Sequence, residues 1–397
     1  MNTVYEILDS LRIVQARLEA SLMEPARPWQ SSAILDGSKA LKDRSILVYG
    51  PRGVGKTSFL VREAKAHRAL YLSMDHPALS TLSVYEAVEA LFQRGVMQVC
   101  LDEIHYAPRW SEDLKALYDA WPDRSIWASG SDSLLFSSGI ADLSRRYIGI
   151  AMPFLSFREF LVLKGLPNFG IHDPFSNDTA WTSEVMAAGN ILGLFETYLS
   201  TGLRPLFMEG ENRYAARIVQ VVQKTLEADI PRMVPIVAQN HFSLMNAVLG
   251  YLSQTTIPLV QVNSLCREWN VGKEKLYSLL HAMEQTGLIR IVRKVSDHAT
   301  RSIGAKLLLA DPSLYSALGG KEGNAREAFV ACALSSMGHR VHAATNEQEA
   351  DFLVDNKFQV EIGGSRKARK KADFVIRDGA DYPVPGMIPL WMMGFGW

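Results

Sequence analysis

The sequence predicts an α/β protein whose first part is built on a parallel sheet. Short apolar segments alternate with segments of helical spacing, and a glycine-rich run directly follows the first apolar segment. Strands that alternate with helices are typical of a parallel sheet with right-handed crossovers. Beyond that part the pattern changes twice, so we expect an α/β core at 1–165, a helical lid at 166–235, a winged helix-turn-helix at 236–300 and a small α/β region at 301–397.

Length and composition limit the functional classes. A chain of 397 residues is too long for one ordinary core. Lys plus Arg and Asp plus Glu number 42 each, so any nucleic-acid surface would have to be local. The three cysteines lie far apart, which argues against disulfides and a zinc site. No segment resembles a signal peptide or a membrane span, so we expect a cytoplasmic protein without a membrane partner.

The elements of the first part follow one another regularly. An amphipathic helix opens the chain, and Pro153 ends the series of strands. Short apolar runs bounded by turn residues are typical of buried parallel strands. The expected strands are 45–49, 69–73, 96–101, 125–129 and 147–152, and the expected helices between them are 57–67, 82–94 and 111–119.

The glycine-rich run GPRGVGKTS matches the phosphate-binding pattern G-x-x-x-x-G-K-[ST]. Its glycines allow backbone conformations in which successive N–H groups point at phosphate. Lys56 is expected to reach the β- and γ-phosphates and Thr57 to ligate Mg²⁺. A chance glycine-rich turn is disfavoured because a strand precedes the run and a helix follows it. The expected nucleotide-contacting residues are Gly50, Pro51, Arg52, Gly53, Val54, Gly55, Lys56, Thr57 and Ser58.

Two acids end the third apolar segment. Asp102 is expected to hold Mg²⁺, directly or through water, and Glu103 to orient or deprotonate the attacking water. An acidic pair that caps a helix would be the simpler interpretation of these residues alone. The phosphate-binding loop about fifty residues earlier favours the catalytic interpretation.

Later candidates leave alternatives open. Ser129 or Ser131, at the end of the fourth strand, could sense the γ-phosphate or simply form a turn. Arg145 or Arg146 could act as an arginine finger, in cis or on a neighbouring subunit, or could be a solvated helix end.

Four segments occur in a familiar order: GPRGVGKTS, CLDEIHYAPRW, ASGSDSLL and LSRRYIGIAMPFLSFREFL. In this order and spacing the chain resembles bacterial and archaeal P-loop ATPases of the AAA superfamily that carry a C-terminal domain of unknown function. The later segment LFETYLSTGLRP is similar to the lid of that family. The resemblance implies ATP as nucleotide, hydrolysis with Mg²⁺, a winged helix and a C-terminal domain like the PD-(D/E)XK nucleases. The family usually has Gly-Arg at 145–146, so only Arg146 can inherit the arginine role.

Residues 240–295 have the order helix, helix, turn, helix, strand, which is that of a winged helix-turn-helix. Gly272 would open the recognition helix, and Lys273, Lys275 and Tyr277 could meet DNA. Many winged helices contact protein instead, so both kinds of partner stay open.

The last region is expected to hold a hairpin at 350–362. If residues 355–357 form its loop, Val354 pairs with Phe358, and Asp351 lies opposite Glu361. Two carboxylates so close repel unless a cation lies between them, so we expect Mg²⁺ to bind there. Glu327 could be a third acid of this site. The layout is similar to that of PD-(D/E)XK nucleases.

One position departs from the nuclease pattern. The residue two after the second acid, normally Lys, is Gly363, and Arg366 or Lys367 could substitute only by reaching in from the next loop. We therefore expect a nuclease-like fold that binds rather than cleaves. The basic run from Arg366 to Lys371 is a candidate phosphate-contacting patch, or simply a solvated surface.

Three functions remain open from the sequence. The first is an ATPase whose nucleotide state controls a C-terminal region that binds DNA or a protein partner. The second is a metal-dependent nuclease gated by ATP, and the third is a nucleotide-binding signalling scaffold that ignores DNA. Oligomerisation is compatible with each of them.

Overall fold

A computed structural model describes residues 4–29, 45–130, 143, 145–233, 239–255, 266–267, 269–295, 305–346, 348–369 and 371–397. The chain divides into two compact units, Met1–Pro153 and Phe154–Trp397. This division precedes the expected boundary at 165 because α8 (Phe157–Leu163) packs within the second unit, where the Phe157 ring contacts Phe195 and Phe395. No helix among the described residues is long and apolar enough to cross a bilayer.

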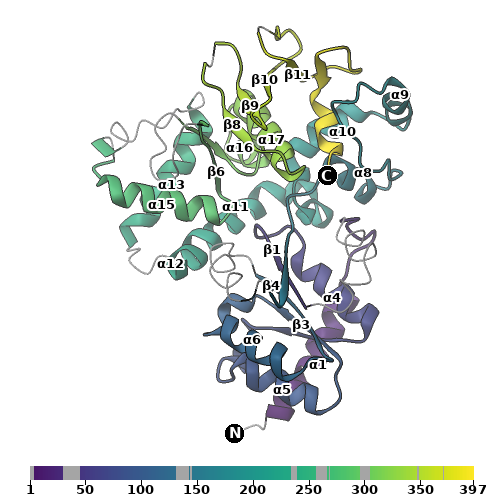
Figure 1. The fold of residues 1–397 in the computed structure, drawn as a ribbon, viewed down its shortest axis with the longest axis vertical. Coiled ribbons are helices and arrows are strands. Elements are labelled where there is room, and N and C mark those ends of the chain that lie inside the picture. Colours follow the sequence, from purple (N-terminus) through teal and green to yellow (C-terminus); the bar gives the residue numbers. More distant parts are fainter. Residues whose placement is uncertain are drawn as a thin grey trace. The chain divides into compact units, whose positions relative to one another are not determined.

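The first unit contains a five-stranded parallel sheet with the order β2-β3-β4-β1-β5 (Figure 1). The five predicted strands are confirmed, with small differences at their ends. They are β1 (Ser45–Tyr49), β2 (Leu70–Ser73), β3 (Gln98–Asp102), β4 (Ser125–Gly130) and β5 (Tyr147–Ala151). The α/β fold predicted for this part is therefore the observed one.

Helices of the first unit bury apolar faces against the sheet. They are α1 (Val4–Ala20), α4 (Lys56–His67), α5 (Val84–Gln93) and α6 (Trp110–Ala120), with short 3₁₀ turns η1 (Pro77–Leu79) and η2 (Ile104–Tyr106). Leu11 of α1, Val88 of α5 and Leu114 of α6 belong to one buried cluster with Leu47 and Leu101 of the strands. Burial of such side chains is the main stabilising term in a unit of this kind.

The strand order determines what lies beside the phosphate-binding loop. β4 lies between β1 and β3, so the carboxyl ends of these three strands are neighbours in the order β1, β4, β3. The loop follows β1, Ser129 lies near the end of β4, and Asp102 ends β3. Ligand sites of open α/β sheets lie at the carboxyl ends of the strands, and this unit follows that rule.

The second unit opens with helices. They are α8, α9 (Thr179–Ala187), α10 (Ile191–Thr197), α11 (Tyr214–Lys224), α12 (Ile230–Met233), α13 (Gln239–Gln254) and α15 (Lys273–Gln285), with the short helices η3 (Tyr198–Gly202), η4 (Pro205–Glu209), η5 (Glu211–Arg213) and η6 (Thr225–Asp229) between them. The helical character predicted for 183–226 is confirmed.

Two of the three helices predicted for 240–286 are α13 and α15, and β6 (Ile289–Val292) is the strand predicted after them. The predicted middle helix lies mostly outside the described residues. β6 pairs antiparallel with β7 (Lys306–Leu309), which lies in the small α/β region expected at 301–397. β7 thus pairs with the strand that follows these helices, and its Lys306 contacts Asp351 in the C-terminal sheet region.

A second, mixed sheet has the order β12-β11-β10-β9-β8. Its strands are β8 (Val341–Ala343), β9 (Phe352–Val354), β10 (Phe358–Gly363), β11 (Phe374–Arg377) and β12 (Met387–Pro389), accompanied by α16 (Ser313–Ala317), α17 (Glu322–Ser336) and η7 (Leu390–Phe395). The apolar tail is buried as η7, and the Trp397 carbonyl oxygen accepts from Arg158.

The predicted hairpin register is confirmed. Val354 pairs with Phe358 and Phe352 pairs with Val360, and the Lys357 N–H donates to the Val354 carbonyl oxygen at 2.9 Å across the turn. Asp355 and Asn356 adopt the left-handed conformations that such a tight turn requires. The next step of the ladder places Asp351 opposite Glu361.

Candidate active site

The loop between β1 and α4 has the backbone of a phosphate-binding loop. Gly53 (φ 78°) and Gly55 (φ 106°) adopt positive φ, which side chains other than glycine rarely allow. α4 begins at Lys56, so the N–H groups of its first turn have no carbonyl acceptor within the helix and face the loop. The helix terminus also carries the positive end of the helix dipole. This end of α4 is therefore suited to an anion.

Two side chains brace the loop. The Lys56 ammonium donates to the carbonyl oxygens of Gly50 at 2.7 Å and Pro51 at 2.8 Å. The Arg27 guanidinium donates to the carbonyl oxygen of Val54 at 2.7 Å and to that of Pro153 at 3.1 Å. Arg27 was not singled out in the sequence, because nothing local connects it with a loop that lies further along the chain.

Gly50 is pinned against the end of β5. A Cβ atom at this position would lie 2.2 Å from the Met152 carbonyl oxygen, and φ is 154°. We expect Gly50→Ala to displace the loop and to weaken ATP binding at least tenfold, with a loss of about 1–3 kcal/mol in the free energy of unfolding. Isothermal titration and urea unfolding measure the two effects.

Gly95→Ala is the matched control for that substitution. Gly95 also has a positive φ (83°), but no atom lies within 4 Å of a Cβ at this position. The control therefore carries the backbone strain without the clash, and nucleotide affinity should stay at the wild-type value. Equal affinities in Gly50→Ala and wild type would show that contact with Met152 does not shape the loop.

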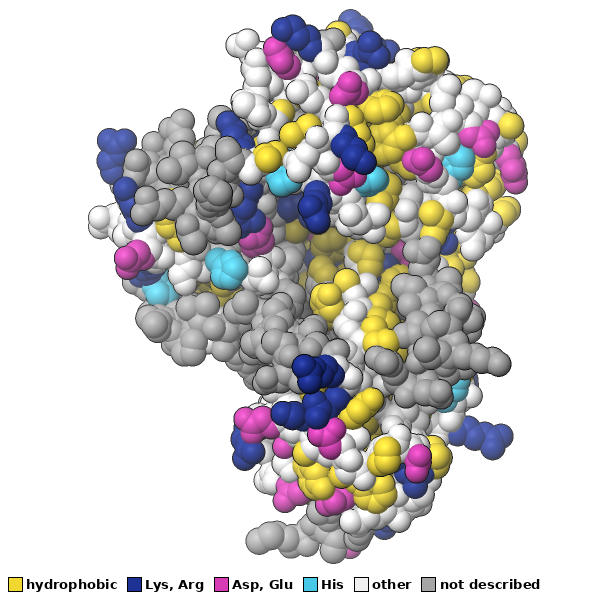
Figure 2. All heavy atoms as spheres, in the orientation of Figure 1, with side chains coloured by type: hydrophobic (Ala, Val, Ile, Leu, Met, Phe, Trp, Pro, Cys, Tyr) yellow, Lys and Arg dark blue, Asp and Glu magenta, His cyan; other side chains and the backbone are white. Residues whose placement is uncertain are grey.

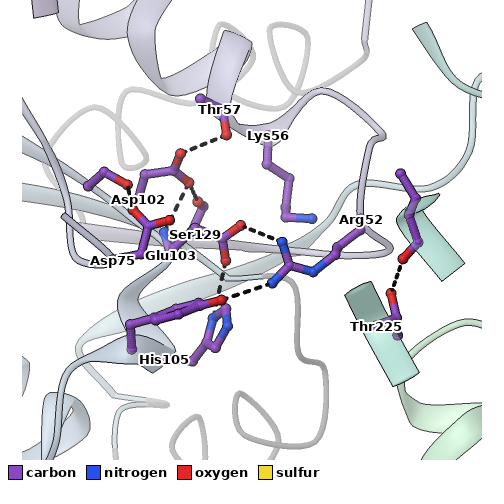
Figure 3. A network of polar contacts seen from close by, with 12 residues as sticks. Arg52, Lys56, Thr57, Asp75, Asp102, Glu103, His105, Ser129 and Thr225 are labelled. Carbon is purple, nitrogen blue, oxygen red and sulfur yellow. Dashed lines mark hydrogen bonds and ion pairs between the residues drawn. The ribbon is translucent and has the colours of Figure 1, made fainter. Parts of the chain in front are cut away.

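Asp102 is the centre of the site (Figure 3). Its carboxylate is 2 % exposed and accepts from Thr57 Oγ1 at 2.6 Å, from Tyr71 Oη at 2.8 Å and from the Ser129 hydroxyl. The backbone N–H of Glu103 donates to it as well, at 3.0 Å. Burial and the neighbouring carboxylate raise the pKa of Tyr71 well above its usual range, so the phenol stays a donor. Thr57 and Asp102, the two residues expected to hold Mg²⁺, are thus in direct contact.

Tyr71 and the position of Ser129 extend the predicted site. Tyr71 was missed, although a phenol within the otherwise apolar strand LYLS was a signal for a buried polar contact. Ser129 contacts Asp102, whereas the other candidate serine, Ser131, lies outside the described residues.

Glu103 has a left-handed backbone conformation, and its carboxylate lies close to the side chains of Arg52 and His105. Its φ of 51° and ψ of 43° are left-handed values that are uncommon for residues other than glycine and typical of functional positions. Its carboxylate lies 3.4 Å from Arg52 Nη1 and 3.5 Å from His105 Nδ1. Arg52 also donates to Tyr106 Oη at 3.4 Å. A side chain of the phosphate-binding loop thus contacts the acid expected to act on water.

Arg146 is not part of this site, which corrects the prediction of a catalytic role in cis. Ser45, at the start of β1, pairs with Tyr147, so Arg146 lies at the amino edge of the sheet, opposite the loop that follows Tyr49. Its guanidinium forms a two-bond ion pair with Asp119 on the surface, at 2.7 and 2.8 Å. The neighbouring Arg145 is exposed in the same turn. A role toward another subunit stays a prediction.

The residues present fit Mg²⁺ and a nucleoside triphosphate. A hydroxyl and a carboxylate, the oxygen ligands that Mg²⁺ prefers, are in contact beside the start of α4. Next to them are a lysine, a glycine cradle and an acid at the end of the neighbouring strand. Pro51, Val54 and Ser58 complete the loop, with Val54 buried and Ser58 exposed. Each predicted residue from Gly50 to Ser58 belongs to this loop or to the first turn of α4.

A second set of charged residues lies in the C-terminal unit. We call Glu327, Asp351 and Glu361 the acidic cluster. Lys306 Nζ lies 3.0 Å from Glu327 Oε2 and 3.3 Å from Asp351 Oδ1, and Lys367 Nζ lies 2.7 Å from Glu361 Oε1. Burial raises the pKa of Glu327 to about 7. The three predicted acids do gather, but two ammonium groups lie among them.

This arrangement does not fit a divalent cation. Carboxylate oxygens that a metal would need already bind Lys306 and Lys367. Within the ranges that the structure describes, no three His, Cys, Asp or Glu side chains are placed to hold a metal ion. Of the two residues that could substitute for a lysine at position 363, Lys367 is the one that reaches the cluster. Its aliphatic stem lies on Gly363, where a Cβ would be 2.5 Å from Lys367 Cγ.

The basic run from Arg366 to Lys371 lies partly on the surface. Arg366, Arg369 and Lys371 are exposed, and Lys371 pairs with Glu349 at 2.8 Å. Lys and Arg side chains also gather in Figure 2 at the end of the molecule that carries the loops of β10 and β11. Phosphate contact by these residues stays a prediction.

A comparison with known protein families supports a nucleotide-binding site in the first unit. Residues 42–161 match the family described as an AAA domain, which consists of P-loop ATPases of the AAA superfamily. Residues 193–325 match a domain of unknown function (DUF8612). A search of curated proteins found no match. The AAA match spans the five-stranded sheet and the site around Asp102, and proteins with this domain generally hydrolyse ATP.

Proposed function

We propose that this chain is a Mg²⁺-dependent ATP hydrolase whose nucleotide state controls its C-terminal unit. The observation that carries the catalytic part is the Thr57–Asp102 contact of 2.6 Å at the start of α4, with Glu103 as the next residue. A phosphate cradle, a Mg²⁺ site and a carboxylate for water are the parts that ATP hydrolysis needs. The AAA match over the same residues supports adenine as the base.

Each residue of the loop has a part in binding. The N–H groups from Gly53 to Thr57 would surround the β-phosphate, and Lys56 would leave the Gly50 and Pro51 carbonyl oxygens for phosphate oxygens. Thr57 and Asp102 would hold Mg²⁺, which when bound neutralises phosphate charge. Ser129 and Tyr71 keep the Asp102 carboxylate in place through their hydroxyl groups.

Glu103 is the group that acts on water. Its carboxylate accepts a proton from, or orients, the water that attacks the γ-phosphate. Arg52 pairs with this carboxylate, and their side chains are only 11 % and 17 % exposed. We infer that Arg52 restrains Glu103 until the loop binds nucleotide, because an ion-paired carboxylate is a poorer proton acceptor.

Arg52→Ala tests this restraint. Without the guanidinium, Glu103 loses its arginine counter-ion and accepts a proton from water more readily, and we expect kcat for ATP to rise by about three- to tenfold, the equivalent of about 1 kcal/mol. KM should change less than kcat, since the loop backbone carries most of the phosphate contacts. Steady-state phosphate release gives both constants.

Arg109→Ala serves as the matched control, because Arg109 pairs with Glu112 on the exposed surface of the same unit. It should leave both constants unchanged. A fall in kcat for Arg52→Ala would instead assign Arg52 to the stabilisation of phosphate charge, and the restraint would be wrong.

The controlled part of the proposal concerns the second unit. Helices α13 and α15 with β6 have the order of a winged helix, and Lys273, Lys275 and Tyr277 open α15 or lie in its first turns. Together with Arg366, Arg369 and Lys371 they could contact DNA phosphates. A protein partner is the alternative, which the equal numbers of acidic and basic residues favour.

ATP turnover measured with and without duplex DNA, over a range of protein concentrations, tests both parts. Stimulation by DNA that disappears in an Arg366→Ala/Arg369→Ala variant would support DNA as the partner. A specific activity that rises with protein concentration would support an arginine supplied between subunits. Negligible turnover by protein that retains one nucleotide per chain and ignores DNA would instead favour the signalling scaffold.

A further inference from the structure

We propose that Lys306 is the resident cation of the acidic cluster, so that ammonium groups pair with Glu327, Asp351 and Glu361 and no divalent metal ion binds there. The contacts that carry this inference are the two distances from Lys306 Nζ, 3.0 Å to Glu327 and 3.3 Å to Asp351. It concerns the C-terminal unit only and does not depend on ATP hydrolysis.

Lys306 is built into the core of this unit. It begins β7, a strand whose four residues are all buried, and it pairs there with Val292 of β6. Its side chain is 4 % exposed, and the ammonium lies 5.3 Å from the centre of the Phe352 ring. Lysine is rarely buried to this extent unless carboxylates surround its ammonium group. The position of Lys306 in β7 therefore places its ammonium group in the acidic cluster, and the burial of the side chain restricts its movement.

The oxygen atoms of Asp351 have protein partners on both sides. Oδ1 faces Lys306 at 3.3 Å, and Oδ2 accepts from the Ile362 N–H at 2.7 Å. Mg²⁺ binds oxygen at about 2.0–2.1 Å in near-octahedral geometry, so it needs the space that the ammonium fills. A metal could enter only if Lys306 left both carboxylates.

Displacement of Lys306 is unfavourable. A buried ammonium that loses its partners without reaching water is strongly unfavourable, and Mg²⁺ gives up its own water reluctantly. Repulsion between three neighbouring carboxylates is the usual reason why a metal binds such a site. Lys306 weakens that reason, because its positive charge lies between the two acids that it contacts and offsets part of their repulsion.

The third acid has its own counter-ion. Glu361 is fully buried and pairs with Lys367 at 2.7 Å, whose stem crosses Gly363. A Cβ at 363 would lie 2.5 Å from Lys367 Cγ, so a larger residue there would displace the stem that carries the ion pair. Every acid of the cluster thus has an ammonium within ion-pair distance.

Mn²⁺ binding to the nucleotide-free chain tests this assignment, with free Mn²⁺ followed by electron paramagnetic resonance. Wild type and Asp351→Asn should bind the same amount of Mn²⁺, because the cluster takes none in either. Lys306→Met should bind one further Mn²⁺ per chain, and Asp351→Asn in that background should remove it. Lys306→Arg, which keeps the cation, should behave as wild type. The P-loop site is unchanged in all five proteins and cancels from the comparison.

Two results would overturn the assignment. Wild type that binds Mn²⁺ at a site lost in Asp351→Asn would show that a metal displaces or ignores Lys306. A folded Lys306→Met variant that gains no Mn²⁺ would show that Lys306 is not what excludes the metal. If Lys306→Met fails to fold, the comparison of wild type with Asp351→Asn still decides: equal binding supports the assignment and unequal binding refutes it.

Discussion

Glu103→Gln should reduce ATP turnover by a factor on the order of 10²–10⁴, because an amide cannot accept a proton from water. Nucleotide affinity should stay close to that of wild type, since the glycine loop, Lys56, Thr57 and Asp102 remain. The variant should therefore bind Mg²⁺ and ATP in a long-lived complex. Phosphate release together with equilibrium binding of a fluorescent ATP analogue separates the two effects.

Glu112→Gln is a suitable control for this loss. Glu112 lies on α6 of the same unit with its side chain 62 % exposed, and its ion pair with Arg109 is on the surface. Turnover should be unchanged in that variant. Hydrolysis by Glu103→Gln at the wild-type rate would mean that another group acts on water.

Asp311→Ala should cause the largest loss of stability. Arg204 and Asp311 are 2 % and 0 % exposed, and Arg204 Nε lies 3.3 Å from Asp311 Oδ2. Asp311 also accepts from the Ser313 N–H at 2.8 Å and from its hydroxyl at 2.6 Å, at the start of α16. Removal of the carboxylate leaves a buried guanidinium without its counter-charge, which costs about 3–5 kcal/mol. Urea unfolding followed by circular dichroism would show an earlier transition for the second unit.

Two further variants make this prediction specific. Asp311→Asn keeps an acceptor for Ser313 but loses the charge, so we expect an intermediate loss. Glu209→Ala breaks the ion pair with Arg217, which is on the surface of the same unit, and should change stability by less than about 1 kcal/mol. Equal effects of Asp311→Ala and Glu209→Ala would contradict a stabilising role for the buried pair.

Local patterns made the nucleotide site predictable. Glycines at 50, 53 and 55 followed by Lys56 and Thr57 need only the strand before them and the helix after them, and both are visible in the sequence. Asp102 and Glu103 were found for the same reason, because an apolar strand directly precedes them. The register of the hairpin could be deduced from its short loop, and it placed Asp351 opposite Glu361.

Contacts between distant segments could not be predicted in this way. Arg27 donates to the phosphate-binding loop, Lys306 of β7 pairs with Glu327 of the acidic cluster, and Arg204 pairs with Asp311. No local sequence pattern encodes these pairs. The strand order is a further case, because β4 could have lain at an edge with the same sequence of elements. The position of Arg146 belongs here as well: the register of β5 places it at the amino edge of the sheet, away from the phosphate-binding loop, and no local pattern shows this.

The most direct test of the central claim is Mg²⁺-dependent phosphate release from ATP by the wild-type chain beside Lys56→Ala. We expect turnover by wild type, its loss on removal of Mg²⁺, and a decrease of at least about 100-fold in Lys56→Ala, because the lysine stabilises charge on the transferred phosphoryl group. Turnover that persists in Lys56→Ala at the wild-type rate, or that does not need Mg²⁺, would contradict ATP hydrolysis at the loop between β1 and α4.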